Sequence, residues 1–386
     1  MARVDSIRSL ISWPLMLAAL VVQAEIQPEP LPVYETLPKE LPDSVLFAHD
    51  ANFDALVAGR VVVLDLAKPT RRYLGAMDAA QFASFIQSRS KPELYVSETH
   101  YSRTTRGERT DVISIYDRES LKQSGEIVLP GGKRGQVVSH RYTLRLVDND
   151  RFLLVFNFTP AASVTVIDTE SRKIVEEVQI PGCGLIYPTG KRGFSSLCSN
   201  GAMFTAQLDS SGKLATQNKL PPLFDVDEDP LFDKPVFHKG HAYFPSYKSL
   251  LRVVDLSSDE PKDLGSWSLL TKEEQAENWR PGGWQITTMD DAGRIYLLMH
   301  KDGKDGTHKS GGPEVWVYDV KSKKRLQKIV LKNWGVSIEV TRGSKPLLAV
   351  TNGDMQIDVY DADSGKWKTM VGGAAAMPLS LHALRK

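Results

Sequence analysis

The sequence predicts an all-β protein, a seven-bladed β-propeller preceded by an extended, proline-rich N-terminal arm. Short stretches of alternating apolar residues recur along the chain, and each ends in an aspartate followed by a polar turn. These aspartates are spaced by about 40 to 65 residues, enough for four strands and their loops. Helical periodicity is almost absent. Strands and turns repeated at this period are typical of propellers, in which each small sheet buries its faces against its neighbours.

The first segment, residues 1–24, has the features of a secretory signal peptide. Arg3 and Arg8 precede an apolar run that ends near Val22, and the small residue Ala24 provides a cleavage site. The run is short for a membrane span and contains Pro14, so a retained membrane anchor is the less favoured alternative. We therefore expect export to the periplasm and cleavage after Ala24.

The second segment, residues 25–44, is rich in proline. Five prolines lie among the nineteen residues from Glu25 to Asp43. Proline fixes the backbone in extended conformations, so this segment predicts a semi-rigid arm that either lies free or embraces a partner.

The remaining residues, 45–386, are predicted to form the propeller. An aspartate at a strand end favours a turn, because its carboxylate accepts backbone N–H groups two residues further on. The aspartates of the repeat, of which the fourth belongs to a degenerate copy, are Asp65, Asp117, Asp168, Asp209, Asp255, Asp319 and Asp361. Residues 269–278, "LLTKEEQAEN", predict an inserted helix that lengthens one interval.

Composition excludes some partners and suggests one cross-link. Lys plus Arg (48) nearly equals Asp plus Glu (47), so nothing favours nucleic acid or an anionic membrane as a partner. Cys183 and Cys198 are the two cysteines. An even number in an exported chain predicts a disulfide, with two buried free thiols as the less expected alternative.

Self-contained catalytic chemistry is not evident in the sequence. It has no Cys-x-x-Cys-His motif for c-type haem and no Gly-x-Ser-x-Gly elbow. His238 and His241 form a His-x-x-His pair without an acidic cluster beside it, so we expect no metal site. We also expect no catalytic residue on this chain.

Four segments together resemble the heavy chain of the tryptophan tryptophylquinone amine dehydrogenases, the methylamine and aromatic amine dehydrogenases. They are "SRTTRGERTDVISIYD" (102–117), "WSLLTKEEQAENW" (267–279), "WRPGGWQ" with "RIYLLMHKDGKDGTHK" (279–309) and the segment from Cys183 to Cys198. The resemblance implies a periplasmic assembly of two heavy and two light chains. The quinone would belong to the light chain, which oxidises primary amines to aldehyde and ammonia and passes electrons to a blue-copper protein, amicyanin- or azurin-like.

The resemblance also implies roles for single residues. Within "HDANFDALVAGRVVVLD" (49–65), Phe53 falls where the family has a phenylalanine that lines the substrate channel. The family similarity is strongest around Arg103, Arg106 and Arg109, which we expect on a loop facing a partner subunit, where arginine pairs well with carboxylates. A solvated loop and a simply packed Phe53 are the alternatives.

Two other functions remain open from the sequence. One is an exported propeller that only binds a protein or ligand, and the other is a self-contained propeller lactonase or hydrolase. The natural amine is also open, because "GKDGTHK" resembles the aromatic-amine branch whereas "RPGGWQ" and "RGERTD" resemble the methylamine branch.

Overall fold

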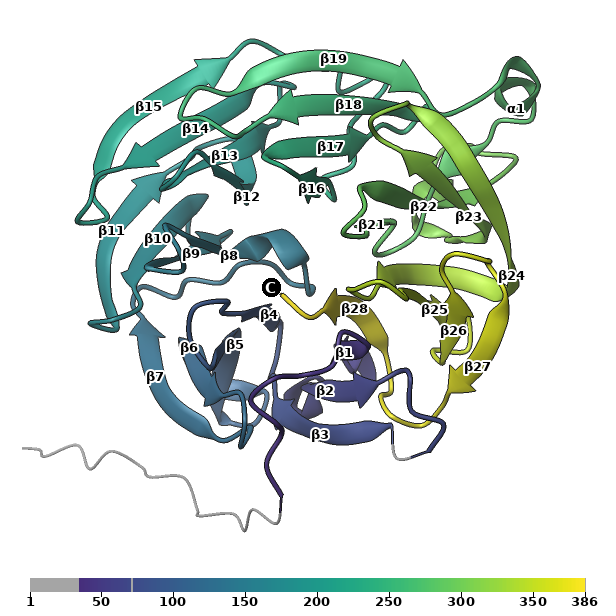
Figure 1. Cartoon of the computed structure of the whole chain (residues 1–386). Helices are drawn as coiled ribbons and strands as arrows, with labels where there is room; N and C mark the ends of the chain where they lie inside the picture. The colour runs from purple at the N-terminus through teal and green to yellow at the C-terminus, as the bar shows by residue number, and fades with distance from the viewer. Residues whose placement is uncertain (1–34, 71, 386) are drawn as a thin grey trace, which may run out of the picture. The chain divides into compact units, whose positions relative to one another are not determined.

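The computed structural model describes residues 35–70 and 72–385, which form β-sheets arranged in a ring and joined by turns and loops (Figure 1). The predicted signal peptide and residues 25–34 of the predicted arm lie outside the described residues. Each four-stranded sheet has one edge strand at the centre of the ring and the other at the rim (Figure 1). The all-β propeller prediction is therefore confirmed at the level of architecture.

Five sheets are separate four-stranded blades. Their strands are antiparallel to their neighbours. From the centre outwards, the first blade contains β28 (Pro378–Ala383), β1 (Val45–Asp50), β2 (Arg60–Asp65) and β3 (Tyr73–Asp78), and the second contains β4 (Ser84–Gln87), β5 (Glu93–Arg103), β6 (Arg106–Asp117) and β7 (Gln123–Leu129). The third blade contains β8 (Leu144–Val147), β9 (Phe152–Asn157), β10 (Ser163–Asp168) and β11 (Lys173–Gln179), and the fourth contains β12 (Cys183–Thr189), β13 (Gly193–Cys198), β14 (Met203–Leu208) and β15 (Leu214–Leu220). The fifth blade contains β16 (Val236–His238), β17 (His241–Pro245), β18 (Leu250–Asp255) and β19 (Lys262–Ser268).

The other strands form one eight-stranded sheet, which corrects the prediction of seven separate blades. They are β20 (Arg280–Pro281), β21 (Thr287–Met289), β22 (Arg294–His300), β23 (Gly312–Asp319), β24 (Lys324–Val340), β25 (Leu347–Asn352), β26 (Ile357–Asp361) and β27 (Trp367–Val371). The sheet is continuous because β24 runs for 17 residues. Its first part pairs with β23 and its last part pairs with β25.

The ring is closed by strands from the two ends of the described chain. β28 pairs with β1 in an antiparallel register, with Phe47 opposite His382. The blade that completes the circle therefore contains one strand from the last part of the sequence and three from the first.

The turn role predicted for the repeated aspartates is confirmed. Asp209 accepts hydrogen bonds from the backbone N–H groups of Ser211 and Lys213, at 2.8 and 3.0 Å. Equivalent bonds to backbone N–H groups two or three residues on form at Asp65, Asp117, Asp168, Asp255, Asp319 and Asp361. Each turn joins the third strand of a four-strand repeat to the fourth.

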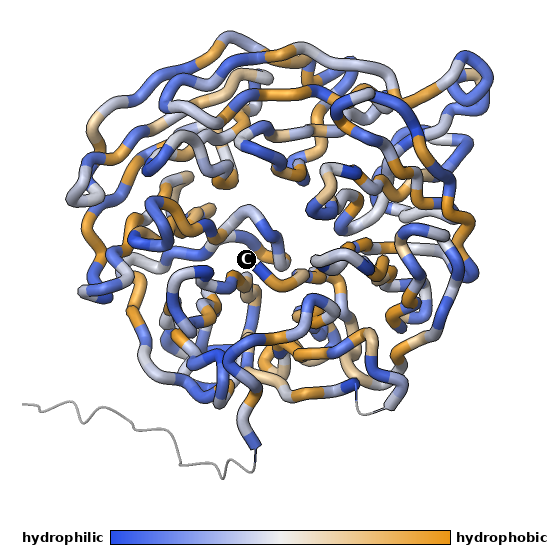
Figure 2. Tube along the Cα trace, in the orientation of Figure 1, coloured by the Kyte–Doolittle hydropathy of each residue, from blue (hydrophilic) through white to orange (hydrophobic). Residues whose placement is uncertain are grey.

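The hydrophobic core lies between neighbouring sheets. Tyr142 lies beside Tyr187, and Tyr187 meets the edge of Phe244 with ring centroids 5.1 Å apart, so aromatic rings link successive blades. Figure 2 shows apolar residues gathered along the strands and polar residues at the connections. Aromatic contacts of this kind add to the stabilisation from burial.

The last part of the predicted arm packs onto the propeller. The N–H of Leu37 donates to the carbonyl of Glu119 at 2.7 Å, and Leu37 and Leu41 are buried in a cluster with Phe47 and Phe85. Burial of these two leucines fixes residues 36–43 against the first two blades.

Among the residues that the structure describes, helical structure is limited to short insertions. The helix predicted near 269–278 is present as α1 (Lys272–Ala276), capped by Thr271 and Glu274 in a reciprocal pair of hydrogen bonds. Three 3₁₀ turns, η1 (Phe53–Ala58), η2 (Arg141–Thr143) and η3 (Thr307–Lys309), lie in connections. No helix among the described residues is both long enough and apolar enough to cross a membrane.

Candidate functional site on one face of the ring

Longer connections gather on one face of the ring, at which the inner strands begin. We call it the Phe53 face; it includes Phe53, Trp284, segments 130–140 and 230–235, and the β5–β6 hairpin. The antiparallel order of each blade places the β5–β6 hairpin on this face, and Gln81, just before β4, donates to the carbonyl of Thr104 in it at 2.9 Å. The opposite face carries the aspartate turns. The Phe53 face therefore has the more variable, loop-built surface, as binding surfaces commonly do.

Phe53 lies at the start of η1 and remains 38% exposed. Its ring is tilted by 58° against Trp284, with centroids 5.9 Å apart. Phe53 also lines a small hollow with Phe82 and Val137. Phe53 therefore packs against Trp284 at the surface rather than within the core.

Trp284 is held in place by its neighbours on both sides. Gly283 has a φ of 129°, and a Cβ there would lie 2.5 Å from the carbonyl oxygen of Val336, so this position requires glycine. The N–H of Trp284 donates to that same carbonyl at 2.8 Å. The glycine pair of "RPGGWQ" thus serves to bring Trp284 close to β24.

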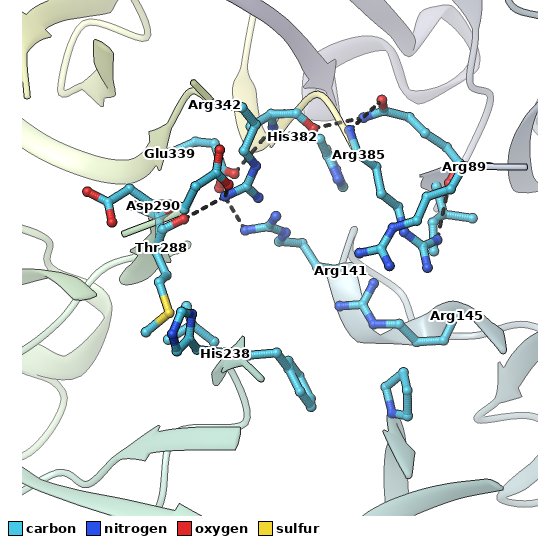
Figure 3. Close-up of a pocket in the computed structure, with 18 of the residues that line it drawn as sticks. Arg89, Arg141, Arg145, His238, Thr288, Asp290, Glu339, Arg342, His382 and Arg385 are labelled. Carbon is cyan, nitrogen blue, oxygen red and sulfur yellow. Dashed lines mark hydrogen bonds and ion pairs between the residues drawn. The ribbon is translucent and has the colours of Figure 1, made fainter. Parts of the chain in front are cut away.

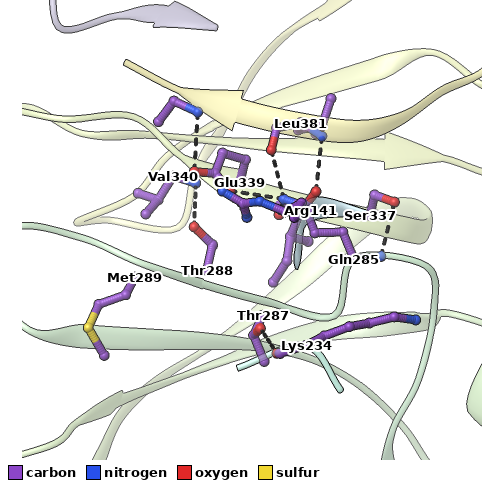
Figure 4. A network of polar contacts seen from close by, with 12 residues as sticks. Arg141, Lys234, Gln285, Thr287, Thr288, Met289, Ser337, Glu339, Val340 and Leu381 are labelled. Carbon is purple, nitrogen blue, oxygen red and sulfur yellow. Dashed lines mark hydrogen bonds and ion pairs between the residues drawn. The ribbon is translucent and has the colours of Figure 1, made fainter. Parts of the chain in front are cut away.

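Gln285 anchors the same turn inside the ring (Figure 4). Its amide donates to the carboxylate of Glu339 at 2.9 Å and to the carbonyl of Leu381 at 3.0 Å, and it accepts from the N–H of Leu381 at 3.0 Å. Glu339 also pairs with Arg141 at 2.8 Å. This buried polar network links β24, β28 and η2, and it fixes the backbone that carries Trp284.

A cavity of about 700 Å³ opens beside Trp284. Its wall combines aromatic and basic groups, including Phe232, Tyr247, His308 and Lys234. Burial lowers the pKa of Lys234, against the opposing effect of Asp233, and burial also lowers the pKa of His308. The cavity is large enough for a small organic molecule.

A buried histidine supports the floor beneath Phe53. His49, on β1, is 1% exposed, and its Nδ1 lies 2.9 Å from the hydroxyl of Ser139. Burial lowers the pKa of His49 to about 4, against the influence of Asp50 and Glu98, so the ring is neutral at pH 7. His49 therefore ties β1 to the segment before β8 without introducing a charge.

The three arginines singled out from the sequence lie on a hairpin rather than on an irregular loop. Arg103 ends β5 and pairs in register with Arg106, which begins β6. Arg109 is bound within the chain, to the carboxylate of Asp111 and the carbonyl of Gly132, both at 2.7 Å. In the described chain, the guanidinium groups of Arg103 and Arg106 form no ion pair, and both residues are exposed.

Apolar side chains are exposed next to this hairpin. Val137 and Phe158 are each 59% exposed, and the N–H of Phe158 donates to the carbonyl of Arg134 at 2.6 Å. Phe53, Val57, Val137 and Phe158 lie on the Phe53 face, as do the exposed Arg103 and Arg106, and we call these four apolar residues the apolar patch. A surface of aromatic and apolar groups bordered by arginine has the composition typical of a protein interface.

The cysteines and histidines identified from the sequence lie elsewhere. Cys183 and Cys198 are joined by a disulfide across the β12–β13 pair. His238 ends the inner strand β16, on the face opposite His308, and the two histidines line different cavities. Among residues 35–70 and 72–385, no group of three His, Cys, Asp or Glu side chains is placed to hold a metal ion.

Trp284 was not singled out as a site residue from the sequence, although it lies in the quoted "WRPGGWQ". The signal that could have identified it is the pair of glycines before a large aromatic residue. Its contact with Phe53 joins segments far apart in the sequence, and no local pattern predicts such a contact.

Comparison with known sequences identifies one family. The sequence profile described as methylamine dehydrogenase heavy chain (MADH) matches residues 45–380. A methylamine dehydrogenase heavy chain from Methylophilus methylotrophus is 30% identical over 298 residues, which are 76% of this chain and 73% of that one. The protein of the same name from Methylorubrum extorquens is 28% identical over 313 residues, covering 80% of this chain and 76% of that one.

Comparison with solved structures supports the fold alone. A putative 6-phosphogluconolactonase from Bacteroides fragilis aligns with a TM-score of 0.59 and 11% identity, covering 92% of this chain and 99% of that one. The dihydro-haem d1 dehydrogenase NirN aligns with a TM-score of 0.52 and 17% identity, covering 90% of this chain and 77% of that one. At these identities the likeness carries no functional conclusion.

Proposed function

This chain belongs to the methylamine dehydrogenase heavy chain family and is the heavy subunit of an amine dehydrogenase, and from this premise we propose how it serves the reaction. The complex would be periplasmic and contain two heavy and two light chains. It would oxidise primary amines to aldehyde and ammonia and pass the electrons to a blue-copper protein.

We place the light chain on the Phe53 face. The observation that carries this proposal is the exposed Phe53, packed against Trp284 within an apolar patch that has free arginines beside it. Covering the patch would remove apolar area from water, and Arg103 and Arg106 would find carboxylate partners on the other chain.

The tryptophan tryptophylquinone of the light chain would supply the oxidation of the amine. The part of this chain would be to shape the approach to the quinone. Phe53 and Trp284 would form an apolar section of the substrate channel and select amines by the fit of their side chains. Once the light chain covers the cavity beside Trp284, bulk water would be excluded from this section of the channel.

Purification of the native protein tests the proposal directly. Subunit composition, visible absorption and amine-dependent dye reduction would be recorded on the same preparation, with methylamine and an aromatic amine as substrates. We expect a small co-purifying chain and a quinone absorption that either amine bleaches. A colourless, lone propeller that is inert to both amines would instead favour an exported binding module.

A further inference from the structure

A second cavity, of about 530 Å³, opens on the face opposite Phe53 (Figure 3). It lies where the inner strands end, and β4, β16, β21, β24 and β28 all contribute to its wall. Six basic side chains line it, together with three acidic ones. The histidines of the wall, His238 and His382, have pKa values lowered by burial and add no charge at pH 7. The lysine and arginine side chains outnumber the carboxylates, so the wall carries an excess of positive charge.

The acidic groups of the wall are already paired. Every carboxylate that lines the cavity has an arginine partner: Glu339 with Arg141 at 2.8 Å, Asp290 with Arg294 at 2.5 Å and Asp291 with Arg342 at 3.7 Å. The unbalanced charge therefore falls on the remaining basic residues, of which Arg89, Arg145 and Arg385 point toward one another in Figure 3.

Arg145 has no acidic partner in the described chain. Its guanidinium lies 4.0 Å from the centre of the Tyr142 ring and donates to the carbonyl of Leu144 at 3.1 Å. Burial lowers the pKa of Arg145 to about 10, against the opposing effect of Tyr142. Such a cation is costly to bury without an anion.

Arg385 is only weakly neutralised. Its guanidinium lies 3.7 Å from Oδ1 of Asp150, whereas Oδ2 of that carboxylate accepts hydrogen bonds from the hydroxyl of Ser88 and the N–H of Ser90, both at 3.0 Å. The guanidinium also donates to the carbonyl of Gln87 at 3.1 Å. Burial lowers the pKa of Arg385 to about 9, and the nearby positive charge of Arg89 lowers it further. Arg385 therefore lies near the positive charge of Arg89, and its one carboxylate neighbour, Asp150, is shared with Ser88 and Ser90.

A buried polar atom lies in the same wall without a partner. His382 is 8% exposed, and its Nε2 has no hydrogen-bond partner in the structure. The ring meets the edge of Phe85 at 5.1 Å, so it is fixed in position. Unpaired buried polar atoms are uncommon in folded proteins and often mark a site for a ligand or water.

We propose that this cavity binds a compact oxyanion with two or three negative charges, held by the guanidinium groups of Arg89, Arg145 and Arg385. The planar forks of arginine match carboxylate and phosphate oxygens, and hydrogen bonds between ionised partners are the stronger kind. The cavity volume suits a small molecule rather than a polymer. The site is separated from the Phe53 face by the Arg141–Glu339–Gln285 network, so it is distinct from the proposed amine channel.

Calorimetric titration of the purified full chain, with any partner chain that co-purifies, tests this site. Inorganic phosphate and citrate would be titrated separately at pH 7, with sodium chloride at matched ionic strength as the reference. We expect saturable binding of at least one of them, and the tighter one identifies a phosphate or a polycarboxylate as the ligand class. Arg145→Gln and Arg385→Gln should each weaken that binding about 10-fold to 100-fold, because each removes a charge-assisted hydrogen bond.

Two further variants keep the test decisive. Lys321→Gln removes a positive charge from an exposed turn outside the cavity and should leave the affinity unchanged. Arg145→Lys keeps the charge and should retain more affinity than Arg145→Gln, which separates binding from a folding defect. No saturable binding of either anion, or equal weakening by Lys321→Gln and Arg145→Gln, would overturn the proposal. The measurement needs no amine turnover, so its outcome is independent of the proposed amine oxidation.

Discussion

The ring of Phe53 rests against that of Trp284 with centroids 5.9 Å apart, although one follows β1 and the other precedes β21. This contact brings two distant parts of the chain to a single exposed point on the Phe53 face.

Phe53→Ala is expected to change amine selectivity. Removing the ring would widen the channel section, and we expect the ratio of kcat/KM for an aromatic amine to kcat/KM for methylamine to change about 10-fold, since such misfit is worth ~1–3 kcal/mol. Dye-coupled steady-state kinetics of the native complex measures this ratio. Tyr73→Ala, which removes an exposed ring from the outer strand β3, is the matched control. An unchanged ratio in Phe53→Ala would remove Phe53 from the channel.

Arg106→Glu is expected to weaken binding of the light chain. Arg106 is exposed and has no ion pair within the described chain, so reversing its charge should cost little stability and act mainly at the interface. The yield of co-purified light chain per heavy chain measures the effect. Lys321→Glu, on the other face, should leave that yield unchanged. If Arg106→Glu purifies with a full complement of light chain, the hairpin does not belong to the interface.

Acidification is expected to destabilise the propeller through His49. The unfolded chain protonates this histidine near pH 6.5, whereas burial keeps it neutral in the folded state down to about pH 4. The free energy of unfolding should therefore fall between these pH values, by roughly 3 kcal/mol in total from this group. The free energy of unfolding, measured with urea, should therefore change less between pH 7 and pH 5 for His49→Asn than for the parent protein.

His100 provides a control with the opposite sign. Its hydrogen bond to Glu98 raises the pKa of His100, against the effect of burial, so protonation of this ring stabilises the folded state as the pH falls. His100→Asn should make the loss of stability on acidification steeper. If His49→Asn and His100→Asn both lost stability more steeply on acidification than the parent protein, the lowered pKa assigned to His49 would be contradicted.

Loss of the disulfide is expected to lower stability moderately. Cys183 and Cys198 are separated by 15 residues, and closing a loop of this length stabilises a fold by about 3 kcal/mol in the chain-entropy model. The double variant Cys183→Ala, Cys198→Ala should therefore unfold at a lower urea concentration, with its β-sheet circular dichroism intact before the transition. If its midpoint equals that of the oxidised parent, the bond contributes nothing to stability.

Local chemistry made the repeat predictable. Asp209 and its counterparts act through backbone N–H groups only two or three residues away, so strand and turn positions could be inferred from short patterns. The same reasoning predicted two separate blades where the long strand β24 joins them into one sheet. Both halves of that strand have strand-like patterns, and the sequence between them has no proline to break the chain.

Long-range relationships were beyond the sequence pattern. The pairing of Phe53 with Trp284 and the convergence of Arg89, Arg145 and Arg385 each depend on how the ring closes. Leu37 and Leu41 were assigned to an extended arm because proline dominates their neighbourhood, but their apolar side chains find a buried place beside Phe47. In each case tertiary packing, which no local motif encodes, decides the environment.

Closure of the ring by β28 and β1 also determines the order of events during synthesis. Residues 378–383 leave the ribosome after every other described strand, so β1 must wait with an unpaired edge until they arrive. Contacts of such high sequence separation form slowly, and open strand edges attract other chains. Until then the edge of β1 is open to pairing with other chains, and we expect a chaperone that covers this edge to raise the yield of folded protein.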